Sequence, residues 1–169
     1  VGYEYKVTRQ DAVTNAWGFL YAGIDLPPVQ SRGILILLVE SNAAVHLAAE
    51  LGRFELDLAG DGWETVRLTA PWKNWNDPGW ASAVTNLKTQ ITAVYTNDPA
   101  HVKAVLLFGH VPVPLSGDCW PDGHNDHRGA WPADTWYGDM STVWTDTNTP
   151  SVNNGARLLN TPGDAKFDP

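Results

Sequence analysis

The sequence predicts an α/β fold with a doubly wound, mainly parallel sheet. Three apolar runs of strand length lie between residues 33 and 108, and two segments with helical periodicity separate them. This alternation is typical of parallel sheets, because each helix returns the chain to the same end of the sheet. A long irregular segment rich in Asp, Trp and Pro follows. We therefore expect a lead-in over residues 1–32, a core over 33–114 and a loop-rich segment over 115–169.

The lead-in carries two patterns that favour β structure. Residues 3–7 alternate in polarity with the period of two that a half-buried strand shows. Residues 17–24 form a second short apolar run, which the pair Pro27-Pro28 closes. We therefore expect a β-type lead-in that ends before the core begins.

The first half of the core reads as strand, helix and strand. Residues 34–39 are an unbroken run of Ile, Leu and Val, which indicates a strand buried on both faces. Ser41 is the expected N-cap of a helix whose apolar residues recur at spacings of three and four over 44–58. Residues 63–68 form the second predicted strand.

The second half of the core adds a helix and a strand. Asp77-Pro78 suits the N-cap and first position of a helix whose apolar stripe covers residues 80–95. Asn97-Asp98-Pro99 ends that helix, and residues 102–108 form the third predicted strand. In the loop-rich segment that follows, we expect one further short strand, around Trp136-Tyr137.

Composition disfavours several classes of function. Nineteen acidic and eleven basic residues give a net charge of −8, which argues against binding nucleic acid through its phosphates. No run of about 18 apolar residues is present, so we expect no membrane span. Cys119 is the only cysteine, which excludes an internal disulfide framework. Few lysines and many Trp, Asn, Thr and Asp residues favour a secreted or cell-surface protein.

Two polar residues follow core strands at the end where ligands bind in open parallel sheets. Glu40 follows the first core strand, and His110 follows the third. The carboxyl ends of parallel strands share one edge, so Glu40 and His110 form a candidate site there. Alternatively, Glu40 caps a helix or faces solvent, and His110 bonds to loop backbone.

The densest cluster of reactive side chains lies in residues 117–127. His124 and His127 are three residues apart and can both reach one metal ion, with Asp122 or Asp126 as a third ligand. A transition metal there would lower the pKa of a bound water and support hydrolysis. Calcium and a purely hydrogen-bonded loop are the alternatives, because Asp, Asn, Gly and Pro are also common in turns.

Further carboxylates along the chain form a second group of candidate ligands. They alternate with asparagines, and Ca²⁺ prefers about six to eight oxygen ligands. The candidate calcium ligands are Asp139, Asp146, Asp164 and Asp168. A solvated loop is the alternative. Calcium is therefore the cofactor we expect first, zinc ranks behind it, and no nucleotide cofactor is expected.

Several short motifs begin at the end of the last core strand and follow one another in a characteristic order. Gly109-His110 ends a strand and leads to a proline pair at residues 112 and 114, and residues 133–139 carry an Ala-Asp and a Tyr-Gly. This order resembles the gingipain-like cysteine peptidase family. Closer similarity is to large secreted bacterial proteins of uncharacterised activity that share this domain. Their further motifs match Pro121–His124, Asp126-His127, Gly129–Asp134 and Pro162–Asp168.

The resemblance implies a caspase-like fold and descent from exported cysteine peptidases. In the family the catalytic His-Cys dyad follows the Tyr-Gly segment, whereas Cys119 precedes it, so the resemblance assigns no catalytic residue in this chain. We therefore expect the N-terminal part of a secreted peptidase domain, catalytically incomplete by itself. The missing C-terminal part of that domain is its expected partner, and a peptide or protein is its expected substrate.

Two alternatives to the peptidase interpretation remain open. One is a metal-dependent hydrolase that uses Asp122, His124 and His127. The other is a calcium-stabilised binding module without enzymatic activity. Val1 opens the sequence and Met140 is the only methionine, so we expect a processed or excised piece of a longer parent in either case.

Overall fold

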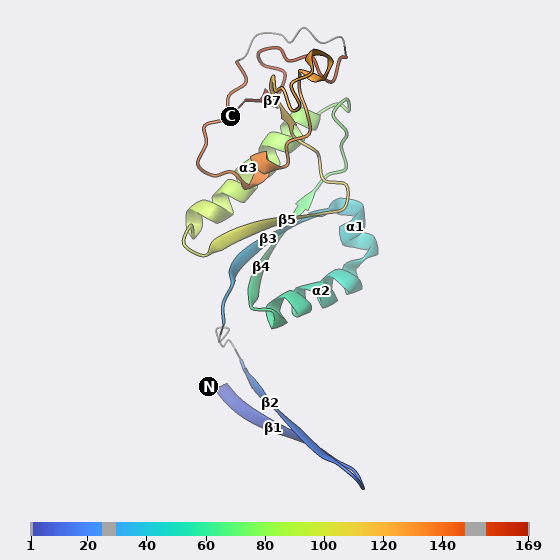
Figure 1. Cartoon of the computed structure of the whole chain (residues 1–169), viewed down its shortest axis with the longest axis vertical. Coiled ribbons are helices and arrows are strands. Elements are labelled where there is room, and N and C mark those ends of the chain that lie inside the picture. The colour runs from blue at the N-terminus through green and yellow to red at the C-terminus, as the bar shows by residue number, and fades with distance from the viewer. Residues whose placement is uncertain (1, 25–29, 148–154, 169) are drawn as a thin grey trace. The chain divides into compact units, whose positions relative to one another are not determined.

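The computed structural model describes residues 2–24, 30–147 and 155–168. Two compact units divide the chain, Val1–Ser31 and Arg32–Pro169. Figure 1 shows the helices and strands of both units.

The first unit is an antiparallel hairpin. Strands β1 (Gly2–Gln10) and β2 (Asn15–Gly23) pair along their full length, from Gly2 opposite Gly23 to Gln10 opposite Asn15. The Asp11 Oδ1 atom accepts hydrogen bonds from the backbone N–H groups of Val13 and Thr14, at 2.9 and 2.8 Å. This local ring of hydrogen bonds is the usual way in which an Asp side chain fixes a turn.

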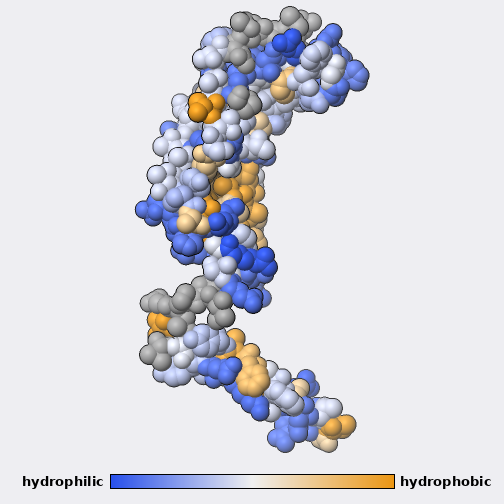
Figure 2. Space-filling view, turned by 60° about the vertical axis from the view of Figure 1, so that its left-hand side comes forward, coloured by the Kyte–Doolittle hydropathy of each residue, from blue (hydrophilic) through white to orange (hydrophobic). Residues whose placement is uncertain are grey.

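The hairpin strands are exposed rather than half-buried as the alternating pattern had predicted. Apolar side chains occupy both faces, and Figure 2 shows the hydrophobic surface that they leave on the hairpin. A two-stranded ribbon has no second layer of its own to cover such side chains. Seven large apolar residues are each more than half exposed: Tyr3, Tyr5, Val7, Trp17, Phe19, Leu20 and Tyr21.

The second unit is built on a three-stranded parallel sheet. Its strands are β3 (Gly33–Glu40), β4 (Trp63–Ala70) and β5 (Val102–Phe108), and their order is β4-β3-β5. Strand β3 is central and pairs in parallel with both neighbours. Its central place explains its continuous apolar run, because residues 36–39 are fully buried.

Helices cover both faces of this sheet, so the chain has the predicted α/β class (Figure 1). On one face, residues 35, 37 and 39 of β3 pack against Leu51 of α2 (Ala48–Gly60), which follows the short helix α1 (Ser41–His46). On the other face, Ile36 and Leu38 pack with buried residues of α3 (Trp80–Asn97). The period of two in β3 therefore divides its side chains between two cores.

Helix boundaries differ from the sequence prediction at three points. The apolar stripe over residues 44–58 belongs to two helices, because the backbone breaks at Leu47 with φ −115° and ψ 29°. Glu40 rather than Ser41 is the N-cap of α1, and its carboxylate accepts the N–H groups of residues 42 and 43. Helix α3 begins at Trp80, because the Asp77 side chain instead accepts the N–H of Asn74 in the preceding loop.

The described residues in the rest of the second unit form four short elements. They are β6 (Leu115–Ser116), the 3₁₀ turn η1 (Asn125–His127), α4 (Thr135–Gly138) and β7 (Lys166–Phe167), with β6 parallel to β7. In the described part of the chain, no helix is long and apolar enough to span a bilayer.

The predicted strand at Trp136-Tyr137 is wrong, because both residues lie in the single turn α4. Tertiary contacts hold this turn in place. The Tyr137 hydroxyl donates to the Pro112 carbonyl at 2.7 Å, and the Trp136 ring stacks on Phe167 with centroids 4.4 Å apart. Burial of two aromatic side chains therefore outweighs their preference for extended backbone.

Candidate metal centre

The cluster of His and Asp residues lies on the loop between Cys119 and Gly129, whose two ends are paired. Cys119 and Gly129 form an isolated antiparallel bridge with N···O distances of 3.0 and 2.9 Å, which closes the loop at its base. Beside this bridge, Arg128 binds the carboxylate of Asp118 with its Nη2 atom at 2.6 Å, and the Asp118 side chain is only 11% exposed. The bridge and the ion pair therefore hold the two ends of the loop together.

Asp122, His124 and His127 lie together at the tip of this loop. The Asp122 Oδ2 atom lies 2.5 Å from His127 Nδ1 and 3.2 Å from His124 Nδ1, and the ligand atoms of the three residues all lie within 4.8 Å of one another. Gly123 has φ +79°, a left-handed conformation that lets the chain reverse between the first two ligands. The cluster therefore comes from one turn of chain and the 3₁₀ turn that follows it.

Hydrogen bonds within the cluster already favour its charged forms. The His127 imidazole and the backbone N–H of His124 hold the pKa of Asp122 below its usual value. The hydrogen bond and charge of Asp122 raise the pKa of His127 in turn. The Asp122 carboxylate is therefore an ionised acceptor to which both imidazole rings point one nitrogen.

One of the two separations from Asp122 is close to the spacing of metal ligands, and the other is shorter. Ligand atoms that lie about 2.0–2.1 Å from a tetrahedral Zn²⁺ are separated from one another by about 3.4 Å. The separation of Asp122 from His124 is 3.2 Å, and that of Asp122 from His127 is 2.5 Å. Binding would require the His127 ring to retreat by about 0.9 Å, a small rotation for a side chain that is 47% exposed.

Two neighbouring residues flank His127, and one of them is hydrogen-bonded to it. The indole Nε1 of Trp131 donates to the His127 backbone carbonyl at 2.6 Å. The Asp126 Oδ2 atom lies 3.8 Å from the His127 Nε2 atom, on the side of the ring away from Asp122. Asp126 therefore does not belong to the group of candidate metal ligands, Asp122, His124 and His127. It lies instead beside the second nitrogen of the His127 ring, a place where carboxylates often orient metal-binding histidines.

The strand-end pair Glu40 and His110 also lies together, in a different arrangement. Glu40 is 3% exposed, and its two oxygens accept from the backbone of Asn42 at 2.7 Å and of Ala43 at 3.0 Å. These hydrogen bonds lower the pKa of Glu40, and the nearby His110 adds a smaller electrostatic contribution. Glu40 therefore occupies the N–H groups that an anionic ligand would otherwise use at this helix terminus.

His110 is held by side chains that the sequence did not single out as its partners. Its Nε2 atom lies 3.0 Å from Asn74 Oδ1, and its ring stacks on Trp72 with centroids 4.1 Å apart. Both partners come from the loop that joins β4 to α3. The signal was their position directly after β4, because the carboxyl ends of parallel strands lie at the same end of the sheet as His110.

The four candidate calcium ligands do not form a common site among the described residues. The only group of three ligand side chains found there is Asp122, His124 and His127. Asp139 accepts from Ser141, Thr142 and Trp144 instead. The other three carboxylates likewise accept backbone N–H groups: Gly163 and Ala165 for Asp146, Thr161 and Lys166 for Asp164, and Asp118 for Asp168.

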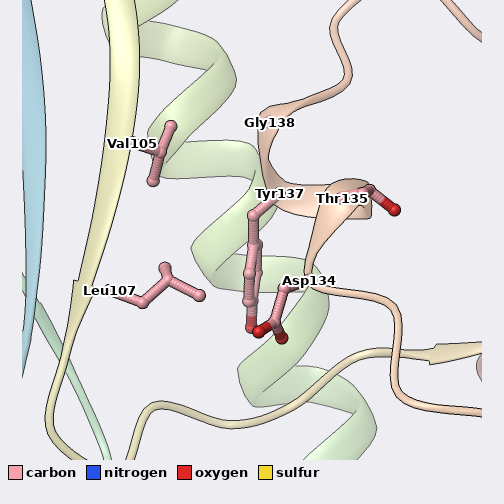
Figure 3. A pocket seen from close by; sticks show the side chains of 6 residues that line it. All are labelled: Val105, Leu107, Asp134, Thr135, Tyr137 and Gly138. Atoms are coloured by element: carbon pink, nitrogen blue, oxygen red, sulfur yellow. The ribbon is translucent and has the colours of Figure 1, made fainter.

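The structure has a pocket beside β5 that the sequence did not predict. It has a volume of about 280 Å³, and α4 forms its other wall (Figure 3). Val105 and Leu107 could have been assigned to one face of β5 by their spacing of two. The opposite wall could not, because Asp134 and Tyr137 reach it only through the turn that had been predicted as a strand.

Comparison with known proteins gives no relative from which a role could be transferred. No family model matches the chain, and neither the curated proteins nor the solved structures contain a match. The geometry of the second unit therefore carries the functional argument.

Proposed function

We propose that this chain is a metal-binding α/β domain in which Asp122, His124 and His127 hold one Zn²⁺ ion. The main support for this proposal is that one carboxylate oxygen and two imidazole nitrogens lie within 4.8 Å of one another. The loop base at Cys119 and Gly129 supports the proposal, because it limits the chain entropy that metal binding would cost.

The donor set favours zinc over calcium. Imidazole nitrogen suits Zn²⁺ and related transition metals, whereas Ca²⁺ prefers oxygen ligands alone. Two of the three donors here are imidazoles, so we propose Zn²⁺ at this cluster in place of the calcium that the composition favoured.

The exposure of the cluster suggests what the metal would do. The side chains of Asp122, His124 and His127 are 43%, 71% and 47% exposed, so the metal's remaining coordination positions face solvent. Zinc would lower the pKa of a water bound there, from about 15.7 in bulk water toward the value of about 9 for aqueous Zn²⁺ or below it. The reaction class that we propose is therefore metal-assisted hydrolysis.

Zinc binding can be tested by titrating the metal-free protein against a chromophoric chelator. We expect one equivalent of Zn²⁺ to bind, and His124→Ala or His127→Ala to weaken binding by roughly a hundred-fold. His101→Ala is the matched control, because His101 is also exposed and pairs with one carboxylate, Asp98, at 2.8 Å. Equal affinity in the His124→Ala and His101→Ala variants would contradict the site.

Hydrolysis needs a separate measurement. A simple activated ester should be cleaved by the zinc-loaded protein, and cleavage should cease on addition of a chelator or in the Asp122→Asn variant. If zinc binds but no chelator-sensitive cleavage is seen, the metal site is supported and the hydrolytic role is refuted.

We also propose, as a second candidate, that the chain is a catalytically incomplete part of a cysteine peptidase. The parallel sheet with helices on both faces supports this, because it is the class of fold that the sequence resemblance implies. The Sγ atom of Cys119 accepts a hydrogen bond from Ser116 Oγ at 3.3 Å, which fits a structural thiol. Thiol-dependent peptide cleavage that Cys119→Ala abolishes would refute this candidate.

A further inference from the structure

The outer edge of β5 lies next to the pocket introduced above. Strand β5 is the last in the sheet order β4-β3-β5, and none of the described residues pairs with its outer edge. Half of the backbone N–H and C=O groups of an edge strand point away from its one neighbour. These groups could accept one more extended strand.

The pocket lies on the face where such a strand would place every second side chain. Val105 and Leu107 alternate to the same face of β5 and form the aliphatic wall. The ring of the buried Tyr137 forms the opposite wall (Figure 3). A side chain on the same face of an added strand would lie beside these residues, because paired strands keep their side chains in register.

The polar group at this pocket is a carboxylate without a counter-charge. Asp134 is exposed, and its carboxylate makes no hydrogen bond or ion pair with any described residue. In Figure 3 its carboxylate lies beside the hydroxyl end of the Tyr137 ring. The cation bound to α4, Lys88, contacts the backbone carbonyls of Trp136 and Asp139 instead of Asp134.

We propose that β5 binds an extended basic peptide segment, which adds a strand to the sheet and places a Lys or Arg side chain in this pocket. The aliphatic stem of that side chain fits Val105, Leu107 and Tyr137, and its charged end meets Asp134. The chain's net charge of −8 also attracts a cationic partner. This binding site is independent of the proposed metal centre.

The test is fluorescence anisotropy with a labelled, blocked peptide of alternating Thr and Val that has one central Lys. A length of seven residues matches the seven residues of β5. Replacing the Lys by norleucine keeps the stem and removes the charge, and we expect roughly five-fold weaker binding at low salt. N-methylation of alternate backbone amides, which removes donors from one edge of the peptide, should abolish binding.

The matched protein variants are Asp134→Asn and Asp57→Asn. Asp57 is also exposed; it lies on α2, which covers the other face of the sheet, and it pairs with Arg53 at 3.3 Å. Asp134→Asn should weaken the Lys peptide roughly five-fold and leave the norleucine peptide unchanged, whereas Asp57→Asn should affect neither. Circular dichroism of Asp134→Asn should match the parent protein, because its carboxylate has no partner to lose.

Three results would overturn the proposal. Equal affinity for the Lys and norleucine peptides would show that Asp134 does not bind the charged end of the side chain. Binding that N-methylation leaves unchanged would remove strand addition. Concentration-dependent self-association that displaces the peptide would assign the β5 edge to a second copy of this chain.

Discussion

Replacing Lys88 by methionine should selectively destabilise the second unit. Lys88 lies on α3, and its ammonium donates to the carbonyls of Trp136 at 2.6 Å and Asp139 at 2.5 Å, with Tyr137 more distant at 3.5 Å. These carbonyls belong to α4 and the residue after it, where a helix end leaves acceptors unsatisfied. Methionine keeps the stem and removes every donor.

The expected loss follows from the two short hydrogen bonds of Lys88. Hydrogen bonds from a charged donor contribute about 1.5–3 kcal/mol each, so the gross effect is about 3–6 kcal/mol. Burial lowers the pKa of Lys88, with the charge of Asp139 opposing, so removing the ammonium also relieves a desolvation cost. Lys88 is only half-buried and water can reach part of the gap, so we expect a net loss of about 2–3 kcal/mol in the free energy of unfolding.

Urea denaturation followed by circular dichroism would measure this loss. Lys73→Met is the matched control, because Lys73 makes one exposed hydrogen bond, to the Pro78 carbonyl at 2.9 Å. We expect that control to lose no more than about 0.5 kcal/mol. If Lys88→Met loses no more than Lys73→Met, the anchoring of α4 by Lys88 is refuted.

The remaining predictions concern substitutions of single residues in the second unit. Hydrogen bonds from Thr142, Ser141 and Trp144 hold the pKa of Asp139 far below its usual range, so its ionised form stabilises the fold above the unfolded pKa and loses that effect as the pH falls. In thermal melts between about pH 5 and pH 2, Asp139→Asn should therefore show a smaller fall in Tm than the parent; an identical fall would contradict this. Gly117→Ala should cost about 1–3 kcal/mol, because a Cβ there would overlap the Asp168 carboxylate. Gly52→Ala on α2 should instead stabilise by up to about 1 kcal/mol, since a Cβ there meets nothing within 4 Å; the reverse order in urea titrations would contradict the packing.

The sheet could be predicted closely because its signal is local. The third predicted strand, over residues 102–108, matches β5 residue for residue, and the first falls inside β3. Burial on both faces produces an apolar run that needs no knowledge of the neighbouring strands. Helix starts were less accurate, because Glu40 and Asp77 form hydrogen bonds that propensity alone does not rank.

The candidate sites depended on contacts that the sequence constrained to different degrees. Asp122, His124 and His127 lie close along the chain, so their proximity was predictable from spacing. The separation of Asp126 from that group was not, because it depends on the direction in which the 3₁₀ turn points each side chain. Calcium binding by Asp139, Asp146, Asp164 and Asp168 stays a prediction; in the structure, at least one oxygen of each accepts a backbone N–H group.

The α/β class, the three core strands and the ligand types of the proposed metal site follow from local patterns in the sequence and from their order along the chain. Long-range packing, in contrast, makes β3 central and β5 an edge strand, folds Trp136 and Tyr137 into α4, and places Asp134 at a pocket. Those features come from packing between segments distant in sequence, where burial and long-range hydrogen bonds outweigh local preference.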